Sequence, residues 1–346
     1  MIDWITAVVK FHHEKPIGGN ITTQIDWNDN LKWQTQSARP LKGSYEDQVS
    51  IKSEHKDGYC SHIFIHGNLV KFFQGHNVFG SEDLKALLSE FLLTLPNHVD
   101  IGRHESPIAH ILDAEIHRID ITNNFRLESR EQVNTWISAT EQSATLKYRG
   151  RGMMTSGTLY YGKHSKRWAL KFYSKGKELE DNKRKHRAVN EALKEYSDSL
   201  LRAELVMRRQ ELKKQNLTTV RKFEELENFG ISDLFEKYIE GLEIGEQAMN
   251  IVDYQKQLTG TQQAAYQMWL QGFDLREVYP KSTFYDHRRN IFNKIGVNVA
   301  VPRTNKKASI SYPTIEFIRA EFEPIPEWAI GTDFYFEPRA GLKAVA

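Results

Sequence analysis

The sequence has one cysteine, Cys60, among its 346 residues, so no internal disulfide can form and a reducing cytoplasm is expected. It also lacks a run of about 18 apolar residues, the length that a membrane helix needs. The longest candidate, "ALLSEFLLTL", is shorter and is interrupted by Glu90. The N-terminus carries an acid at Asp3 and no basic stretch, so we expect no signal peptide. These absences predict a cytoplasmic protein with no membrane partner.

Charge of one sign is not in excess either. The chain has 47 Lys and Arg against 45 Asp and Glu, a formal net charge of +2. Net charge alone therefore says little about partners. With 40% apolar and 27% charged residues the composition is that of a globular protein, and the length allows two domains.

Strand and helix patterns alternate through the first two thirds of the chain. Alternating strands are expected in "DWITAVVKF", "AEIHRIDITNNF" and "LRAELVMRR", and "GTLYYGKHSKRWALKFYSK" predicts a hairpin. "HIFIHGNLVKFF" predicts two strands joined at Gly67-Asn68 by a type I′ turn. The next segment predicts a helix capped by Ser81, and residues 20 to 45 predict loop or irregular strand. The mixture predicts an α+β fold around a mainly antiparallel sheet flanked by helices.

The pattern becomes helical after about residue 215. From Met249 onward it is helix, turn, helix, with turns at Gly272 and Pro280. We therefore predict three parts: a main domain over 1–218, a helical connector over 219–248, and a helical C-terminal region over 249–346.

Three of the expected strands carry polar residues that would share one face. Asp120, Glu204 and Tyr173 each lie on the polar side of an alternating strand, and Lys175 follows Tyr173 on that side. If the strands are neighbours, two carboxylates would lie beside a phenol. Two carboxylates suit Mg²⁺ or Mn²⁺, and a metal-bound phosphate next to a tyrosine suits phosphodiester transfer to the phenol oxygen. Lys175 would favour the phenolate.

The spacing of these residues alone favours an ordinary structural role for each of them. A tyrosine in a strand is often just a good β-former, and both acids have an arginine nearby in sequence. The histidines of "HIFIH", His62 and His66, would lie about 13 Å apart along a strand, too far to share an ion. We therefore expect both histidines to be partly exposed residues of the sheet and not a pair of metal ligands.

Basic and aromatic residues alternate between residues 147 and 168. Cations that release counterions, beside rings on which bases stack, are typical of single-stranded DNA binding. A solvated hairpin tip is the alternative, and Tyr160 and Tyr161 compete with Tyr173 as nucleophile. The candidate DNA contacts are Arg149, Arg151, Lys163, Lys166 and Arg167.

"YPKSTFYDHRRNIFNKIGVNV" has the proportions of the second helix of a helix-turn-helix unit, with Ser282 as expected N-cap. Helix pairs of this kind are also common without DNA. The residues placed to contact a major groove are Lys281, Thr283, Tyr285, Arg288 and Arg289.

The chain resembles the replication initiators of filamentous phages, the gene II protein type that starts rolling-circle replication. Matching segments occur in the family's order and span most of the chain. "QGHNVFG" is the most specific of them. The segments are "FFQGHNVFGSEDL", "HRIDIT", "FYSKGKEL", "LLRAEL", "MNIVD" and "IEFIRAEFEPIPEWAIGTDFYFEP".

The resemblance implies an HUH-like nickase domain over 1–218 and a site-specific single-strand cut at the viral origin. It places the nucleophile on Tyr173, with Lys175 and Glu178 completing that motif, and the acidic positions on Asp120 and Glu204. The protein would become joined to the 5′ phosphate and later close the displaced strand into a circle. Double-stranded replicative-form DNA, single-stranded viral DNA, a host helicase and a host polymerase are the implied partners in the bacterial cytoplasm, with oligomers on DNA left open.

Two rivals remain at this point. One is a plasmid replication initiator or relaxase with the same chemistry, and the other is a non-catalytic origin-binding regulator. The resemblance also implies that Met249 starts a second, shorter protein, which would bind DNA without cutting it.

Overall fold

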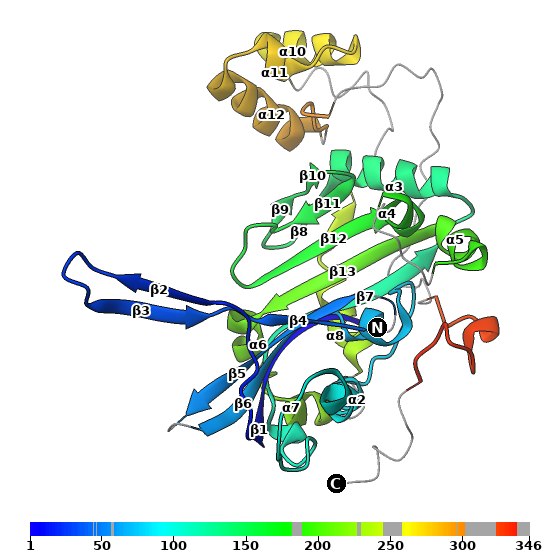
Figure 1. The fold of residues 1–346 in the computed structure, drawn as a ribbon. Helices are drawn as coiled ribbons and strands as arrows, with labels where there is room; N and C mark the ends of the chain where they lie inside the picture. Colours follow the sequence, from blue (N-terminus) through cyan, green and yellow to red (C-terminus); the bar gives the residue numbers. More distant parts are fainter. Residues whose placement is uncertain are drawn as a thin grey trace.

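A computed structural model describes residues 1–43, 45, 47–56, 59–181, 189–226, 230–244, 258–295, 297–301 and 323–337. Its main feature is a nine-stranded sheet in the order β10-β11-β12-β13-β7-β1-β6-β5-β4, with antiparallel pairings throughout (Figure 1). The α+β class with a mainly antiparallel sheet is confirmed. The strands are β1 (Ile2–His13), β4 (Arg39–Lys42), β5 (Gln48–Lys56), β6 (Tyr59–Gly67), β7 (Glu115–Arg126), β10 (Met153–Thr155), β11 (Thr158–Tyr161), β12 (Trp168–Ser174) and β13 (Leu200–Arg208).

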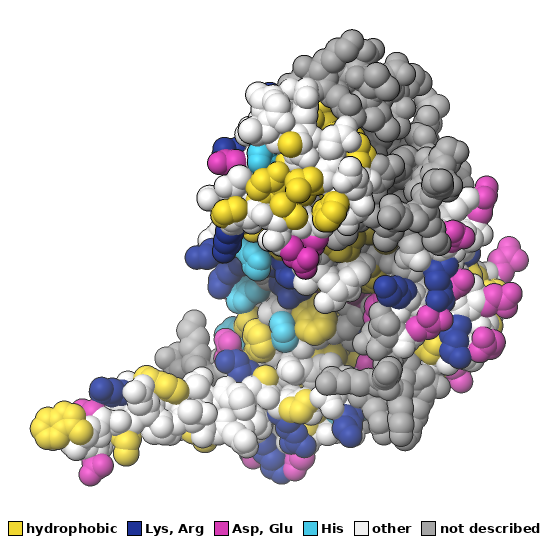
Figure 2. All heavy atoms as spheres, turned by 90° about the horizontal axis from the view of Figure 1, so that it is seen from above, with side chains coloured by type: hydrophobic (Ala, Val, Ile, Leu, Met, Phe, Trp, Pro, Cys, Tyr) yellow, Lys and Arg dark blue, Asp and Glu magenta, His cyan; other side chains and the backbone are white. Residues whose placement is uncertain are grey.

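Two smaller sheets complete the β structure. One is a hairpin that projects from the body, β2 (Ile21–Ile25) with β3 (Leu31–Gln36), where the sequence predicted loop or irregular strand (Figure 1). Figure 2 shows hydrophobic side chains at the far end of this arm. The other sheet joins β8 (Ala144–Leu146) to β9 (Gly150–Arg151) and β14 (Leu242–Ile244).

The helices pack on the sheet or form the C-terminal region. None in the described part of the chain is long and apolar enough to cross a bilayer. They are α1 (Leu69–Gln74), α2 (Leu84–His98), α3 (Arg130–Ser143), α4 (Lys175–Asp181), α5 (Glu191–Asp198), α6 (Arg209–Lys214), α7 (Val220–Glu224), α8 (Ile231–Ile239), α10 (Gly260–Leu270), α11 (Leu275–Val278) and α12 (Lys281–Ile295), with 3-10 turns at Ile111–Asp113 and Glu327–Ala329.

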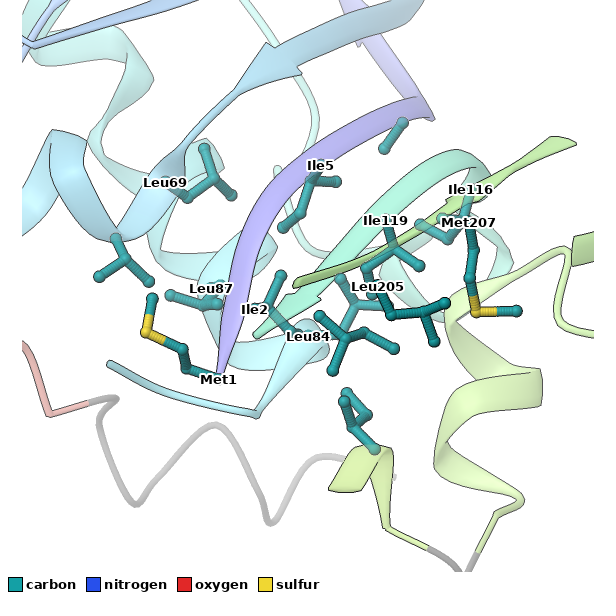
Figure 3. Close-up of a cluster of buried hydrophobic side chains, with 14 of the residues drawn as sticks. Met1, Ile2, Ile5, Leu69, Leu84, Leu87, Ile116, Ile119, Leu205 and Met207 are labelled. Atoms are coloured by element: carbon teal, nitrogen blue, oxygen red, sulfur yellow. The ribbon is translucent and has the colours of Figure 1, made fainter. Parts of the chain in front are cut away.

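The main hydrophobic core lies on one face of the sheet. Ile5, Ala7 and Val9 of β1 are fully buried, and β7 and β13 contribute Ile119 and Leu205 to the same cluster. Figure 3 shows side chains from these strands meeting those of α2. Alternation along each strand sends the intervening polar residues to the other face, and that face carries the candidate site.

Two local predictions are wrong. Gly67-Asn68 is not a hairpin turn: β6 ends at Gly67, and the Asn68 side chain accepts a hydrogen bond from the Lys71 backbone N–H at 2.8 Å to cap α1. Ser81 does not cap α2. That role belongs to Asp83, whose carboxylate accepts from the Ala86 N–H at 2.8 Å. The first error takes a helix N-cap for a hairpin turn, because Gly-Asn suits both, and the second chooses the wrong member of a run of good capping residues.

The C-terminal helices form a hydrophobic cluster of their own, whereas α7 and α8 share the main core through Val220 and Phe235. The boundaries at 218 and 248 stay predictions, and Met249 lies outside the described residues. The C-terminal cluster consists of Leu258, Ala265, Tyr266, Trp269, Leu275, Phe284, Ile291 and Val299.

Residues 249–346 expressed alone are expected to fold and to retain DNA binding without cleavage, because the fragment keeps that cluster and α12 but lacks Tyr173. About a hundred residues can bury enough surface to fold alone. A circular dichroism melt and a gel-shift assay check this. A non-cooperative melt together with no DNA retention would refute it.

Candidate active site

The three strands with polar candidates are neighbours, in the order β12-β13-β7. The register sets Lys171 opposite Glu204, Tyr173 opposite Arg202, and Val206 opposite Asp120. Because side chains alternate, Tyr173, Glu204 and Asp120 lie on one face of the sheet. The geometric expectation therefore holds, while the roles of these residues stay predictions.

The Tyr173 phenol is half-buried and donates a hydrogen bond to Glu204 Oε2 at 3.4 Å. Burial raises the pKa of this phenol well above its ordinary value, and the nearby carboxylate of Glu204 adds to the effect while Arg202 opposes it. The resting phenol is thus protonated. A reaction at its oxygen needs a proton acceptor, and Glu204 is the carboxylate within reach.

Lys175 does not continue the strand as expected. It is the first residue of α4 and is fully buried. Its ammonium donates to Asn77 Oδ1 at 2.8 Å and to Glu178 Oε2 at 2.6 Å. Burial lowers the pKa of Lys175 to about 8, against the opposing charge of Glu178. These two hydrogen bonds hold Lys175, and with it the start of α4, in place two residues after Tyr173.

Both carboxylates are buried, and each is paired with a cation. Asp120 accepts from Arg118 Nε at 2.8 Å and from Arg118 Nη2 at 2.7 Å, and Glu204 forms an ion pair with Lys171. Burial raises the pKa of Asp120 to about 7, the charge of Glu204 adds to this, and Arg118 opposes it. Sequence reasoning missed Lys171. Its signal was its position two residues before Tyr173, on the same side of the strand.

The donor set is compatible with a divalent cation but does not complete a site. Among the described residues, no group of three or more His, Cys, Asp or Glu side chains could hold a metal. Asp120 and Glu204 supply hard oxygen donors, and burial raises the pKa of Asp120, with a smaller contribution from the charge of Glu204 that a bound cation would offset. Because Mg²⁺ commonly keeps several waters and takes one or two carboxylates, two ligands fit its chemistry. An incoming ion would compete with Arg118 and Lys171.

The structure distinguishes the two rival tyrosines. Tyr161 is fully buried in the core, and its hydroxyl lies 3.5 Å from the Thr140 carbonyl oxygen. Tyr160 pairs with Lys171 in the register and is half-buried on the polar face. A cavity of about 300 Å³ holds both Tyr160 and Tyr173. Its lining is Ser156, Gly157, Thr158, Tyr160, Lys171, Tyr173, Ser174, Lys177, Glu178 and Glu204.

The "QGHNVFG" segment closes one end of this face. Asn77 donates to buried Asp3 at 2.6 Å, accepts from Lys175, and accepts at its backbone carbonyl from buried Arg202. Asp3 also accepts from Asn68 at 2.7 Å. These contacts tie the N-terminal strand to β12 and β13. Sequence reasoning identified the segment by resemblance but missed the contacts of its Asn77 with Asp3 and Arg202.

His76 in the same segment is buried and neutral. Its Nε2–H donates to the Phe334 carbonyl at 2.8 Å, and burial lowers its pKa to about 3. Since the unfolded chain takes up this proton near pH 6.5, stability should fall as pH drops below 6.5, by about 2 kcal/mol at pH 5. Urea melts at pH 7 and pH 5 measure the loss. His76→Gln should reduce the pH dependence by that amount, and an unchanged dependence would contradict the assignment.

Several predicted DNA contacts have partners within the protein. Arg151 lies 3.5 Å from the Phe292 ring and donates to the carbonyls of Arg288 and Arg289, and Arg167 donates to Glu211 at 2.7 Å. The other predicted contacts lie beside aromatic rings, are exposed, or have polar partners. Arg149 lies 4.0 Å from the Trp168 ring, Lys163 lies 5.1 Å from the Tyr160 ring, Lys166 is exposed, Arg288 donates to Asn298, and Arg289 pairs with Asp286.

In α12, Lys281 begins the helix, so Ser282 is not its N-cap as predicted. Tyr285 is exposed and Thr283 half-buried. A surface pocket between α12 and the β9–β10 region, about 540 Å³ in volume, joins the two groups of predicted contacts. It is lined by Arg151, Gly152, Met153, Tyr285, Asp286, Arg288 and Arg289. Their roles in DNA binding stay predictions.

Comparison with known proteins gives three findings. Residues 1–226 match the family model that describes the N-terminal part of the replication-associated gene 2 protein. The chain is 28% identical over 334 residues to the replication-associated gene 2 protein of Enterobacteria phage I2-2, covering 94% of this chain and 95% of that one. A solved rolling circle replication initiator protein from Geobacillus stearothermophilus is 12% identical, with a TM-score of 0.33 over 73% of this chain and 89% of that one. The family model matches more than half of the residues of this chain, so the chain belongs to the family of the replication-associated gene 2 protein.

Proposed function

We propose that this protein cuts one DNA strand at a phage origin, stays attached to the new 5′ end through Tyr173, and later rejoins the strand. It would thereby start and end rolling-circle replication. The observation that carries the proposal is the Tyr173 phenol, which donates to Glu204 inside a cavity that Lys171 also lines. A phenol nucleophile, a proton acceptor and a cation lie together there, as phosphoryl transfer requires.

In the cutting step, Tyr173 Oη forms a bond to the scissile phosphorus while the bond from phosphorus to the 3′ oxygen breaks. The phenol proton passes to Glu204, which already accepts its hydrogen bond. The 3′ oxygen leaves and takes up a proton from water. Lys171 places positive charge beside the phosphate oxygens. Joining reverses the step, and no nucleotide is needed because the phosphotyrosine bond conserves the energy of the phosphodiester.

Asp120 and Glu204 would hold Mg²⁺ (or Mn²⁺), which would withdraw charge from the scissile phosphate when bound. The protein's own part is to position these carboxylates. Asp120 is fixed by two nitrogens of the Arg118 guanidinium, and Glu204 is fixed by Lys171 and Tyr173. Lys175 would act as a positioning residue, because its contacts with Asn77 and Glu178 hold the start of α4 directly after Tyr173.

The partners of this reaction are proposed from its products. The protein would act on double-stranded replicative-form DNA and on single-stranded viral DNA in the bacterial cytoplasm. A host helicase and polymerase would extend the free 3′ end. The α12 residues and the basic segment around Arg149 would bind origin DNA. Binding of more than one copy of the protein to that DNA is compatible with this proposal.

A supercoiled plasmid that carries the cognate origin tests the function. With Mg²⁺ we expect nicked circles that retain protein on one 5′ end after denaturation. The same plasmid without the origin should stay supercoiled. A non-catalytic origin-binding regulator would bind the plasmid and leave it uncut, which would overturn the proposal.

A further inference from the structure

A row of aromatic and cationic side chains crosses the polar face of the sheet next to the candidate active site. The register pairs Asp120 with Trp4, Thr6 with His66, and Val8 with Phe64. Alternation therefore places Trp4, His66 and Phe64 on the face that carries Asp120 and Glu204. We call this set the open-face row; it consists of Arg208, Arg118, Trp4, His66, Phe64 and Lys52.

The rings of the open-face row contact one another and the cations beside them. His66 lies 5.0 Å from Trp4, edge to face, and 6.0 Å from Phe64 in a stacked arrangement. Arg118 lies 5.7 Å from the Trp4 ring, and Lys52 lies 5.5 Å from the Phe64 ring. All of these side chains are half-buried, whereas their neighbours on the core face are fully buried. The rings are thus packed in part against their neighbours and accessible in part to a ligand.

Two arginines in the row face each other directly. Arg118 on β7 pairs with Arg208 on β13, and like charges in such a position are destabilising. Arg118 is neutralised by Asp120, but Arg208 has no ion-pair partner among the described residues. One of its terminal nitrogens also lacks a hydrogen-bond acceptor, as does the Trp4 indole N–H. Burial and the charge of Arg118 lower the pKa of Arg208. This arrangement suits an anion.

We propose that the open-face row binds single-stranded DNA, with a phosphate at Arg118 and Arg208 and bases stacked on Trp4 and Phe64. The proposal rests on the proposed function, because it leads the strand across the sheet to Tyr173. Single-stranded DNA fits better than duplex, since only unpaired bases offer their faces to rings on a sheet. It is a binding site separate from the basic residues around Arg149 and in α12.

Equilibrium binding to the full chain tests this without cleavage, in a Tyr173→Phe background. The probes are a fluorescently labelled single-stranded 20-mer of mixed sequence and a duplex of the same sequence. Fluorescence anisotropy measures the binding of each probe. Trp4→Ala and Phe64→Ala should each weaken single-strand binding by about 5- to 100-fold and leave duplex binding unchanged. Arg208→Met should reduce the slope of log K against log salt by about 0.7.

Trp27→Ala is the matched control, since Trp27 is 90% exposed but lies beyond β2, away from this face. It should bind both probes as the parent does. Trp4→Phe keeps an aromatic face, so it should retain most of the affinity even if Trp4→Ala folds poorly. If the double variant with Trp4→Phe and Phe64→Ala bound single-stranded DNA as tightly as the parent does, the proposal would be overturned. An equal loss of affinity for duplex DNA would also overturn it. Because cleavage is not read, these outcomes are independent of whether Tyr173 is the nucleophile.

Discussion

Replacing Tyr173 with phenylalanine is expected to abolish covalent attachment to DNA while origin binding stays near that of the parent protein. The phenol oxygen forms the bond to phosphorus, so its removal leaves no nucleophile at this position. The cost to folding should be small, because the lost hydrogen bond to Glu204 is long, at 3.4 Å, and a strand accepts phenylalanine readily. Denaturing gels with end-labelled origin DNA measure the adduct.

Tyr160→Phe is the matched control for this change. Tyr160 lines the same cavity and faces the same side of the sheet, so it shares the surroundings but not the assigned role. This variant should still form the adduct. If Tyr173→Phe forms the adduct and Tyr160→Phe does not, the nucleophile has been assigned to the wrong tyrosine.

Asp120→Asn and Glu204→Gln should each lower the nicking rate by about 10²-fold or more. Each change keeps the size of the side chain but removes a charge that would hold the cation, and Glu204→Gln also removes the proton acceptor of Tyr173. The apparent Mg²⁺ requirement should rise along with the loss of rate. Nicking rates over a Mg²⁺ series, with thermal melts of each variant, measure both effects.

The melts matter because Arg118 and Lys171 lose their carboxylate partners in these variants. Breaking a partly buried pair destabilises a protein even where no chemistry is involved. Glu115→Gln is the control, since Glu115 lies on the same strand as Asp120 but at its exposed end. It should nick normally. Full nicking at ordinary Mg²⁺ by a folded Asp120→Asn protein would remove Asp120 from the site.

Strand alternation was enough to predict which side chains share a face. It placed Tyr173, Glu204 and Asp120 on polar sides, and the sheet order then brought those sides together. Alternation failed at Lys175, because the chain turns into α4 at that residue and the side chain turns inward to Asn77. A local pattern does not include a partner that lies 98 residues away.

Contacts between distant segments account for the rest of what the sequence did not reveal. By alternation Arg202 shares the polar face of β13 with Glu204, yet it is fully buried because the "QGHNVFG" segment covers that end of the strand. Trp4, Phe64 and Arg208 are separate positions in sequence, and they form a row only through the order β13-β7-β1-β6. Strand order is a property of the whole sheet, so no single segment could predict it.

Mapping the DNA-linked residue tests the central claim most directly. The full chain is incubated with origin DNA and Mg²⁺, the denatured adduct is digested with nuclease and trypsin, and the peptide carrying a nucleotide is sequenced by mass spectrometry. The modification is expected on Tyr173, in the peptide that follows Lys171 and ends at Lys175. Modification of Tyr160, or nicked DNA with no linked peptide, would contradict the assignment.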